Sequence, residues 1–596
     1  MKKSTVAPLL ACLLLSPLAF TSCTDDHYDL NEVDSTIGVG SDGLRLPTSS
    51  TDEIQLFDVL ELNESDVVKI QENGDYMFEQ DGGDVTPARP MIDIIQISKQ
   101  STTSEALVIP KNLITGINAM GKKTGVRKAD NIGKEAPVNH FDFSGNKPAE
   151  VLSLKTVSVD ANIKLAVSFS SALKSCVTKI AKLSLNMPSY MSFTASTTSG
   201  DLSVNGNKIT LANISTANEI TLNIDINALD FKSGNNGTLA IEGGKIKMDG
   251  TVVMGVEISP SDINLSGLTS GDLSITSQIQ FPDFKVTGAQ GRFSPTIDLG
   301  NLGEATINNV PDFLKDGNVV VDLANPQIWL TTNSDLTLDG YVDGVIKAYK
   351  KGQVIASVDV KNINILANAT SKICICRNAS LVDGSMFTQV IEVPTLSTLI
   401  RTIPDKLVFE ADARADSQKE YAITFGRQYN ISPSYTIKAP IAFAEDARIV
   451  YNDSIEDMNK DLKDLDFAEG TYINVDANVE NKVPAHLTVS AYAVDVNGKR
   501  MSDDLISIVV SNVVAASPDG TTPVVTPLNI KVQQKKAGEL KNVDKLMFTI
   551  EGSAKENGNT VEGVTLNAYK HTLIARDIVV KVVSKMIIEQ SRAITI

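Results

Sequence analysis

The sequence is poor in the residues that build most active sites and sugar-binding platforms. Its 596 residues include one tryptophan, four histidines and 5% aromatic residues in total. The histidines, which are His27, His140, His486 and His571, show no His-x-x-x-His spacing, and no Cys-x-x-Cys pair accompanies them. Zinc sites normally need such ligand spacings. No metal or cofactor is therefore expected.

Catalytic motifs are also missing. The chain has no Gly-x-Ser-x-Gly elbow and no phosphate-binding Gly-x-x-x-x-Gly-Lys-Ser/Thr loop. Ser171-Ala172-Leu173-Lys174 matches the Ser-x-x-Lys motif of β-lactamases, but Lys123-Thr124-Gly125 precedes it, which reverses the order in that family. We therefore expect no enzyme. Because 72 residues are Asp or Glu, a hidden carboxylate pair of the glycosidase kind stays an open alternative.

The 54 Lys and Arg residues are also outnumbered by the 72 Asp and Glu residues. The formal net charge is −18. Binding to nucleic acid depends on Lys and Arg that neutralise phosphates, so no nucleic-acid partner is expected. Electrostatic docking onto anionic lipid is disfavoured for the same reason.

Only one long apolar run is present, and it lies at the N-terminus. Val6 to Phe20 follows the basic start Met1-Lys2-Lys3. The run is shorter than the roughly 20 residues that span a bilayer and has the length of a signal-peptide core. It ends in Phe20-Thr21-Ser22-Cys23, which resembles the lipobox of bacterial lipoproteins. The resemblance implies a signal peptide over 1–22 and a lipidated Cys23 as the first mature residue.

The residues after Cys23 suggest a location. Asp25-Asp26 follows the cysteine almost directly, which resembles the surface-export signal of Bacteroidota lipoproteins. The resemblance implies a palmitate-bearing lipoprotein on the outer face of the outer membrane, with the membrane as its partner through Cys23. Two or three acyl chains on one residue give stable anchoring, since each buried CH₂ contributes about 0.8 kcal/mol.

Cysteines beyond the anchor are few. Cys12 leaves with the signal peptide, so Cys176, Cys374 and Cys376 remain. An odd number permits at most one internal disulfide. Cys374 and Cys376 are two residues apart in a predicted strand, where both point to the same face. We predict buried free thiols.

Alternating apolar and polar residues dominate the rest of the chain. Asn73-Gly74 and Asn205-Gly206-Asn207 separate alternating runs and predict hairpins. Many short strands with frequent turns predict β-sandwiches. The stretch from Val319 to Leu330, with Asn325-Pro326, weakly resembles late-embryogenesis-abundant type 2 domains, which implies immunoglobulin-like sandwiches. Ile473 to Val479 and the strand after it repeat this pattern in degenerate form, although coincidence between two hairpins is the alternative.

The expected fold is therefore all-β, with tandem immunoglobulin-like β-sandwich domains after a flexible lipidated tether and a few short helices. The expected segments are a signal peptide (1–22), an acidic tether (23–65), a small β-hairpin region (66–146) and three sandwiches (147–269, 270–393 and 394–596). Within the tether, Leu44–Pro47 and Ile54–Leu56 have the composition of short strands.

Two helices and two modification sites are also expected. Thr395 is placed to cap a helix over 396–403. Ser454 with Asp457 resembles a capping box for an amphipathic helix over 454–465, with Ile455, Met458 and Leu462 on its apolar face. Ser35 and Ser454 lie in Asp-Ser/Thr-apolar sequences that resemble Bacteroidota O-glycosylation sites.

These features predict a non-catalytic surface lipoprotein that acts as a binding, adhesion or structural module, with a protein or glycan partner of unknown identity. One alternative is a glycan-binding accessory lipoprotein of a polysaccharide-uptake system, against which the scarcity of aromatics counts. A second is a lipid- or hydrophobe-binding envelope protein, which needs a large apolar pocket. A third is a fimbrial subunit.

Overall fold

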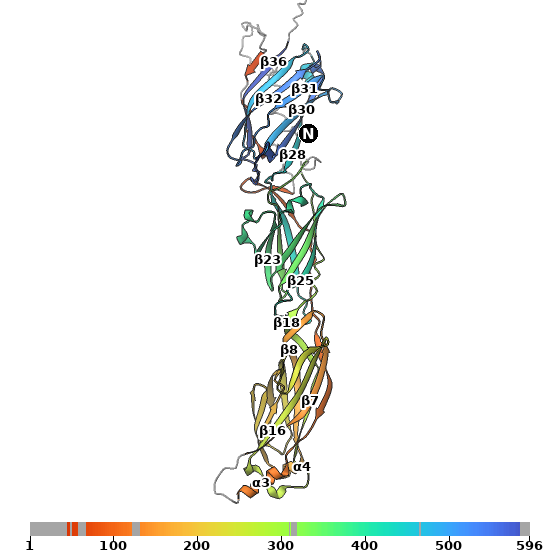
Figure 1. The fold of residues 1–596 in the computed structure, drawn as a ribbon, viewed down its shortest axis with the longest axis vertical. Helices are drawn as coiled ribbons and strands as arrows, with labels where there is room; N and C mark the ends of the chain where they lie inside the picture. Colours follow the sequence, from red (N-terminus) through yellow and green to blue (C-terminus); the bar gives the residue numbers. More distant parts are fainter. Residues whose placement is uncertain are drawn as a thin grey trace, which may run out of the picture.

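The computed structural model describes residues 44–47, 50–57, 67–121, 131–308, 310, 319–463 and 467–584. The expected signal peptide (1–22), Cys23, Asp25-Asp26 and Ser35 lie outside these residues. The described chain forms an elongated molecule with three β-rich domains stacked along its long axis (Figure 1). The predicted all-β, multi-domain fold is confirmed.

The terminal domain, named for the ends of the described chain, contains two sheets. One has the order β1-β36-β29-β32-β31, with β2 also paired to β36, and the other is β28-β33-β30. The bounds are β1 (Leu44–Pro47), β2 (Ile54–Gln55), β28 (Arg448–Ile455), β29 (Tyr472–Asn481), β30 (His486–Asp495), β31 (Ile506–Ser511), β32 (Val524–Gln534), β33 (Val543–Ser553) and β36 (Thr572–Val583), with α5 (Met458–Leu462), η9 (Leu540–Asn542) and the hairpin β34 (Lys555–Glu556)/β35 (Asn559–Thr560).

The central domain also contains two sheets, of order β24-β23-β20-β27-β4-β3 and β19-β25-β21-β22. Among the strand pairs of the described residues, only β23–β24 is parallel. The bounds are β3 (Val68–Ile70), β4 (Tyr76–Asp81), β19 (Asn301–Thr306), β20 (Gln327–Ser334), β21 (Gly340–Lys350), β22 (Gln353–Ile365), β23 (Ala369–Cys376), β24 (Gln389–Glu392), β25 (Lys406–Ala415) and β27 (Ile431–Pro440), with η6 (Ala379–Leu381), η7 (Gly384–Met386) and η8 (Leu396–Leu399).

The distal domain, farthest from the terminal domain, is one long curled sheet of order β10-β13-β8-β18-β5-β7-β16-β9-β12-β11. The bounds of this path are β5 (Ile95–Ser104), β7 (Ile132–Asn146), β8 (Val151–Phe169), β9 (Lys179–Asn186), β10 (Met191–Thr197), β11 (Asp201–Asn205), β12 (Lys208–Ser215), β13 (Ile220–Asp230), β16 (Lys245–Ile258) and β18 (Phe284–Phe293). Joined to its sides are β6 (Leu107–Val108), β14 (Ser233–Gly234), β15 (Gly237–Glu242), β17 (Ser274–Gln280) and β26 (Tyr421–Thr424).

Helical turns gather at the free end of the distal domain. They are α3 (Lys111–Gly121), α4 (Ser171–Cys176), η3 (Pro260–Asp262) and η4 (Leu265–Gly267), and Figure 1 shows α3 and α4 at this end. Ser170 caps α4, since its hydroxyl accepts the backbone N–H of Leu173 at 3.2 Å. The exposed turn of residues 217–219 lies beside α4, because Lys174 Nζ donates to the carbonyl of Ala217.

The three domains are nested in the sequence. The terminal domain is built from both ends of the described chain, and the central domain is built from segments inside them. The distal domain is inserted between β4 and β19 of the central domain. Strand pairing therefore joins segments that the expected boundaries keep apart: β4, from the expected hairpin region, pairs with β27 of the expected third sandwich.

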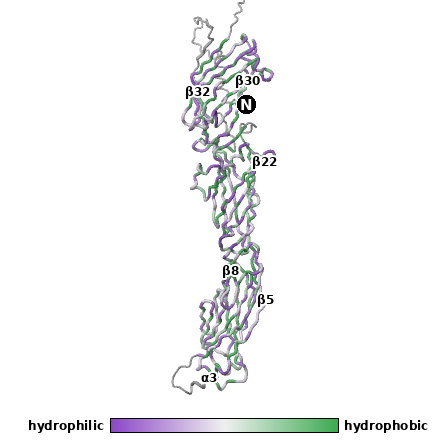
Figure 2. Tube along the Cα trace, viewed as in Figure 1, coloured by the Kyte–Doolittle hydropathy of each residue, from purple (hydrophilic) through white to green (hydrophobic). Residues whose placement is uncertain are grey.

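Alternation along the strands produces the cores. In β8, residues from Val157 to Val167 alternate between buried and exposed positions, and Figure 2 shows apolar and polar residues interleaved along the strands rather than gathered in blocks. One apolar core runs through the distal and central domains and reaches into the terminal domain at Leu56 and Val450, and a second lies within the terminal domain. The continuous first core makes the distal and central domains one packed unit.

The predicted turns are present. Asn73-Gly74 separates β3 and β4, which pair antiparallel, and Gly74 has φ of 89°. Gly206 between β11 and β12 has φ of 58°, a conformation that glycine adopts without steric cost. The expected strands at Leu44–Pro47 and Ile54 also form, and both pair with β36. The terminal domain thus begins inside the segment expected to be tether.

Both predicted helices are present only as shorter elements. Ser454 lies in β28 opposite Met547, and the helix α5 covers only Met458–Leu462. Its N-cap is Asp457, which has left-handed backbone and makes no side-chain cap hydrogen bond. Pairing of β28 with β33 extends to Ile455 and takes up the residues expected to start the helix. Residues 396–399 form only a 3₁₀ turn, with no hydrogen bond from the side chain of Thr395.

Two strands, one in the terminal domain and one in the central domain, end in similar polar corners. β29 and β20 each end in a polar residue, and the following strand enters the opposite sheet. Asn481 Oδ1 accepts the N–H of Val483 at 2.7 Å, and Ser334 Oγ accepts the N–H of Leu336 at 3.2 Å. Ser334 therefore has the corner position in the central domain that Asn481 has in the terminal domain.

Candidate functional site

A polar pocket opens on the outer face of the terminal domain. It has a volume of about 160 Å³ and is lined by Asp476, Ala477, Asn478, Asn512, Pro527, Leu528, Asn529 and Asp577. A single water needs about 10–15 Å³ of such space. The pocket therefore has room for a small polar ligand, or for one end of a larger one.

Irregular backbone creates this pocket. The pairing of β29 with β36 shifts register between Asp476 and Asn478. Opposite the shift, Asp577 has φ of 51°, and Asn512, just after β31, has φ of 69°. Asp and Asn tolerate this left-handed conformation better than other L-residues. The bulge turns the Asp577 carboxylate toward Asn478 rather than along the strand.

The amide nitrogens of the pocket are used within the protein. Asn478 Nδ2 donates to Asp577 Oδ2 at 3.0 Å, and Asn512 Nδ2 donates to the carbonyl of Pro527 at 2.7 Å. Asn529 Nδ2 donates to Asp476 Oδ1 at 2.7 Å and to Asn474 Oδ1 at 2.8 Å. The other carboxylate oxygen of Asp476 accepts Asn474 Nδ2 at 2.9 Å. Each carboxylate oxygen has more than one lone pair, so Asp476 and Asp577 can still accept hydrogen bonds from groups that donate, such as sugar hydroxyls.

A second surface feature surrounds the single tryptophan. Trp329 lies on the outer face of β20, and its ring meets Phe387 edge-on at a centroid distance of 5.2 Å. Lys438 Nζ lies 4.4 Å from the ring centroid, and the indole N–H donates to Gln327 Oε1 at 2.8 Å. Trp329 is only partly buried because the core face of β20 is taken by Ile328 and Leu330.

Two carboxylates come close together where the central and distal domains meet. The Tyr421 hydroxyl donates to Asp339 Oδ2 at 3.0 Å and lies 3.3 Å from Asp416 Oδ2. Lys419 Nζ lies 3.4 Å from both aspartates. The N–H of Gln418 and the Lys419 ammonium lower the pKa of Asp416 despite burial. Asp416 therefore stays ionised at neutral pH. Through Tyr421, the two aspartates of the central domain are bonded to β26 of the distal domain.

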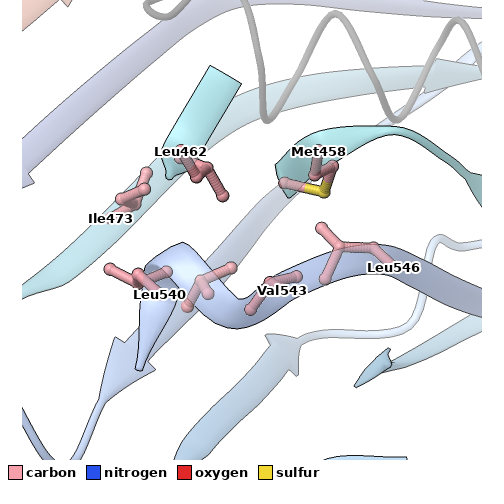
Figure 3. Close-up of a pocket in the computed structure, with 7 residues that line it drawn as sticks. Met458, Leu462, Ile473, Leu540, Val543 and Leu546 are labelled. Carbon is pink, nitrogen blue, oxygen red and sulfur yellow. The ribbon is translucent and has the colours of Figure 1, made fainter. Parts of the chain in front are cut away.

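An apolar cavity lies beside α5 in the terminal domain. Figure 3 shows side chains from α5, β29, η9 and β33 that point toward one another around it. Its lining is Met458, Leu462, Ile473, Val532, Leu540, Val543 and Leu546, and its volume is about 20 Å³. That is room for about one water, too little for an acyl chain. This cavity therefore does not supply the large pocket that the hydrophobe-binding alternative needs.

No protein-family model matches the chain, and no curated protein matches it. Among solved structures, the chain is similar to a crystal structure of a protein from Parabacteroides distasonis that is inferred to be secreted. The two share 17% identity with a TM-score of 0.34, over 47% of this chain and 81% of the other. A likeness at this level defines neither fold nor activity. Within the described residues, no helix has the length and apolarity needed to cross a membrane.

The structure does not bring the predicted site residues together. Cys23 and Ser35 lie outside the described residues, and Ser454 is half-buried within β28. Cys176, Cys374 and Cys376 are free and buried, as predicted. The hydrogen bond with the neighbouring Cys376 thiol and burial both raise the pKa of Cys374, so that thiol stays protonated and unreactive near neutral pH.

Sequence reasoning missed the polar pocket. Its only visible signal was the alternation of Asn474, Asp476 and Asn478 along one strand. The partners Asn512, Asn529 and Asp577 come from three other segments, and only the order of strands in the sheet places them together. In the part of the chain that the structure describes, no group of three or more His, Cys, Asp or Glu residues is arranged to hold a metal ion.

Proposed function

We propose that this protein is a non-catalytic cell-surface lipoprotein, anchored to the outer membrane through Cys23, that acts as a binding, adhesion or structural module. In this proposal it works as a stiff spacer of immunoglobulin-like sandwiches. The terminal domain lies nearest the membrane, and the distal domain is held away from it.

The observation that carries the proposal is the nesting of the domains. β1 is the first described strand of the chain, and it pairs with β36 in the terminal domain. A lipid on Cys23 would therefore hold the molecule by that end. The distal domain, with α3 and α4 at its free end, lies at the opposite end of the long axis (Figure 1).

Stiffness follows from the way the domains are joined. In the sequence, β26 lies between β25 and β27 of the central domain. It nevertheless adds to the distal domain by pairing with β18. Beyond that strand, Phe425 packs edge-on against Phe293 at a centroid distance of 6.2 Å. β8 alone has 19 residues, which at about 3.3 Å per residue span roughly 60 Å. A distal domain of this length with a continuous core resists bending.

The anchor is tested by labelling cells with a palmitate analogue, comparing wild type with Cys23→Ala. Loss of label in the variant is expected, and retained label would overturn the anchor. The orientation is tested with one epitope tag inserted after Asn218, at the free end of the distal domain, or after Asn497, in a turn of the terminal domain. On intact cells, antibody is expected to bind the Asn218 insertion more strongly. Equal or reversed binding, with equal total protein, would contradict the orientation.

The acceptor-lined pocket favours a second function, glycan binding by an accessory lipoprotein of a polysaccharide-uptake system. Asp577→Asn tests it, because asparagine also accepts a left-handed backbone while the carboxylate is lost. Asp503→Asn, at an exposed position of the same domain, is the matched control. A glycan-array signal that falls at least tenfold in Asp577→Asn but not in the control supports this function, whereas equal signals in both variants exclude the pocket as its site.

A further inference from the structure

Two of the four histidines are buried in the terminal domain. His571 and His486 have exposed fractions of 3% and 6%. His571 Nδ1 accepts the backbone N–H of Asn567 at 3.0 Å, and His486 Nδ1 accepts the backbone N–H of Ala516 at 3.2 Å. A histidine nitrogen accepts a hydrogen bond only when it carries no proton. Both hydrogen bonds therefore require the neutral ring.

Residues 554–571, here called the joint segment, run between β33 and β36 of the terminal domain and contact the central domain. The N–H of Leu566 donates to the carbonyl of Ile441, and that of Gly563 donates to Phe443, at 2.8 and 2.9 Å. The N–H of Ala568 donates to the carbonyl of Gly74 in the β3–β4 turn at 2.8 Å. These hydrogen bonds form the terminal–central junction together with the side chain of Asn567 and with Ala554, Leu566 and Ala568, which pack into the apolar core of the central domain.

Asn567 is the centre of this junction and is 3% exposed. Its Nδ2 donates to the carbonyl of Asn73 at 3.0 Å and to Asp75 Oδ1 at 2.9 Å. Its Oδ1 accepts the N–H groups of Tyr569 and Lys570. The backbone N–H of the same residue is the one that His571 holds. His571 thus positions Asn567, whose side chain is hydrogen-bonded to the central domain.

The loop between β31 and β32 lies against both rings. Ala516 is bonded to His486, and a Cβ placed on Gly520 would lie only 2.3 Å from His571 Nε2. His486 also faces the joint segment, at Glu556 and the carbonyl of Asn559. A change of charge on these two rings would act on the loop and on the joint segment at once.

The charged groups around the rings are few. Burial lowers the pKa of His571 to about 4, against the attraction of Asp75 and with the repulsion of Lys570. Burial also lowers the pKa of His486, against the attraction of Glu556. The carboxylate of Asp519 in the loop accepts the N–H groups of Thr521 and Thr522, and that of Glu53 accepts the Thr572 hydroxyl. Near pH 7 both rings are neutral.

We propose that the joint segment is an acid-operated hinge, in which a proton from solvent on Nδ1 of His571 and of His486 releases the terminal domain from the central domain. Each protonated Nδ1 becomes a donor that faces the N–H donor of Asn567 or Ala516, so both hydrogen bonds are lost. Because the folded-state pKa values lie below the ordinary 6.5, the junction is intact above pH 6.5 and weakens as the pH falls from 6.5 toward 4.

The test uses the full described chain with spin labels on Gln353→Cys in the central domain and Asn497→Cys in the terminal domain, both exposed positions. The width of the distance distribution is measured by electron paramagnetic resonance at pH 7.5 and pH 4.5. At least a twofold broadening at pH 4.5 is expected. Emission of Trp329, which lies in the central domain, is recorded on the same samples and is expected to stay unchanged.

Variants make the result specific. His571→Asn with His486→Asn keeps an acceptor oxygen near each Nδ1 position but cannot titrate, so its distribution is expected to stay narrow at both pH values. Asn567→Ala is expected to be broad at both. His140→Asn, a change at an exposed histidine of the distal domain, should behave as wild type. The proposal is overturned if wild type stays narrow, if the double variant broadens as wild type does, or if broadening coincides with a shift of Trp329 emission.

Discussion

Leu46 of β1 and Val580 of β36 are paired in adjacent antiparallel strands, so the first and last described strands of the chain lie side by side. In the sequence, the two paired strands flank the segments that form the other two domains. It also ties the start of the described chain to one end of a long molecule. The testable consequences concern the junctions and the core that keep that molecule extended.

Asn567→Ala is expected to destabilise the terminal–central junction by about 2–3 kcal/mol. Its buried amide bonds to Asn73 and Asp75, and its removal leaves these acceptors without their donor. Urea denaturation measures the loss. Asn497→Ala, in an exposed turn of the same domain, is the control and should change the free energy of unfolding by less than about 0.5 kcal/mol. Equal effects of the two would mean that the side chain of Asn567 does not support the junction.

Gly520→Ala is expected to cost about 2 kcal/mol or more. Gly520 has φ of 71°, and an added Cβ would lie 2.3 Å from His571 Nε2. Left-handed backbone costs a non-glycine residue about 1 kcal/mol, and the buried ring has little room to move. In a double-mutant cycle, His571→Ala should recover part of the cost by removing the clash. An additive cycle would show that the two residues do not interact.

Tyr421→Phe should weaken the central–distal junction by about 1.5–3 kcal/mol, because its hydroxyl lies within hydrogen-bond distance of Asp339 and of the ionised Asp416. The control is Tyr492→Phe, at a tyrosine whose ring packs under the guanidinium of Arg500. Since the pKa of Asp416 is lowered in the folded state, its contribution is full above the ordinary value of about 3.9 and is lost as the pH falls below it. Denaturation at pH 7 and pH 3 should therefore show a smaller effect of Tyr421→Phe at pH 3.

The apolar cavity beside α5 predicts opposite effects of two substitutions. Leu462→Ala enlarges the cavity and should cost about 2–5 kcal/mol. Val543→Ile adds one methylene toward the existing space of about 20 Å³ and should stabilise the terminal domain by about 0.5–1 kcal/mol. Thermal unfolding of both variants measures the changes. A destabilising Val543→Ile would mean that the side chains around the cavity cannot accommodate the larger residue.

Local features were predictable from the sequence because their causes are local. Asn73-Gly74 and Asn205-Gly206 form turns because glycine adopts positive φ freely, and alternation along β8 divides its residues between core and solvent. The free, buried state of Cys374 and Cys376 followed from their shared face on one strand. The helix expected from Ser454 begins only at Met458, because pairing of β28 with β33 outweighs the capping pattern.

By itself, the sequence determined that the chain is built of strands, where many of its turns fall and that its thiols are buried, since each depends on residues close together in the chain. Only the tertiary structure decided that β1 pairs with β36, that the distal domain is inserted into the central one, and that Asp476, Asn478, Asn529 and Asp577 share a pocket. Strand order depends on contacts between residues far apart in sequence, and many pairings of alternating strands bury their apolar faces equally well. Which pairing forms is settled by the packing of the whole core.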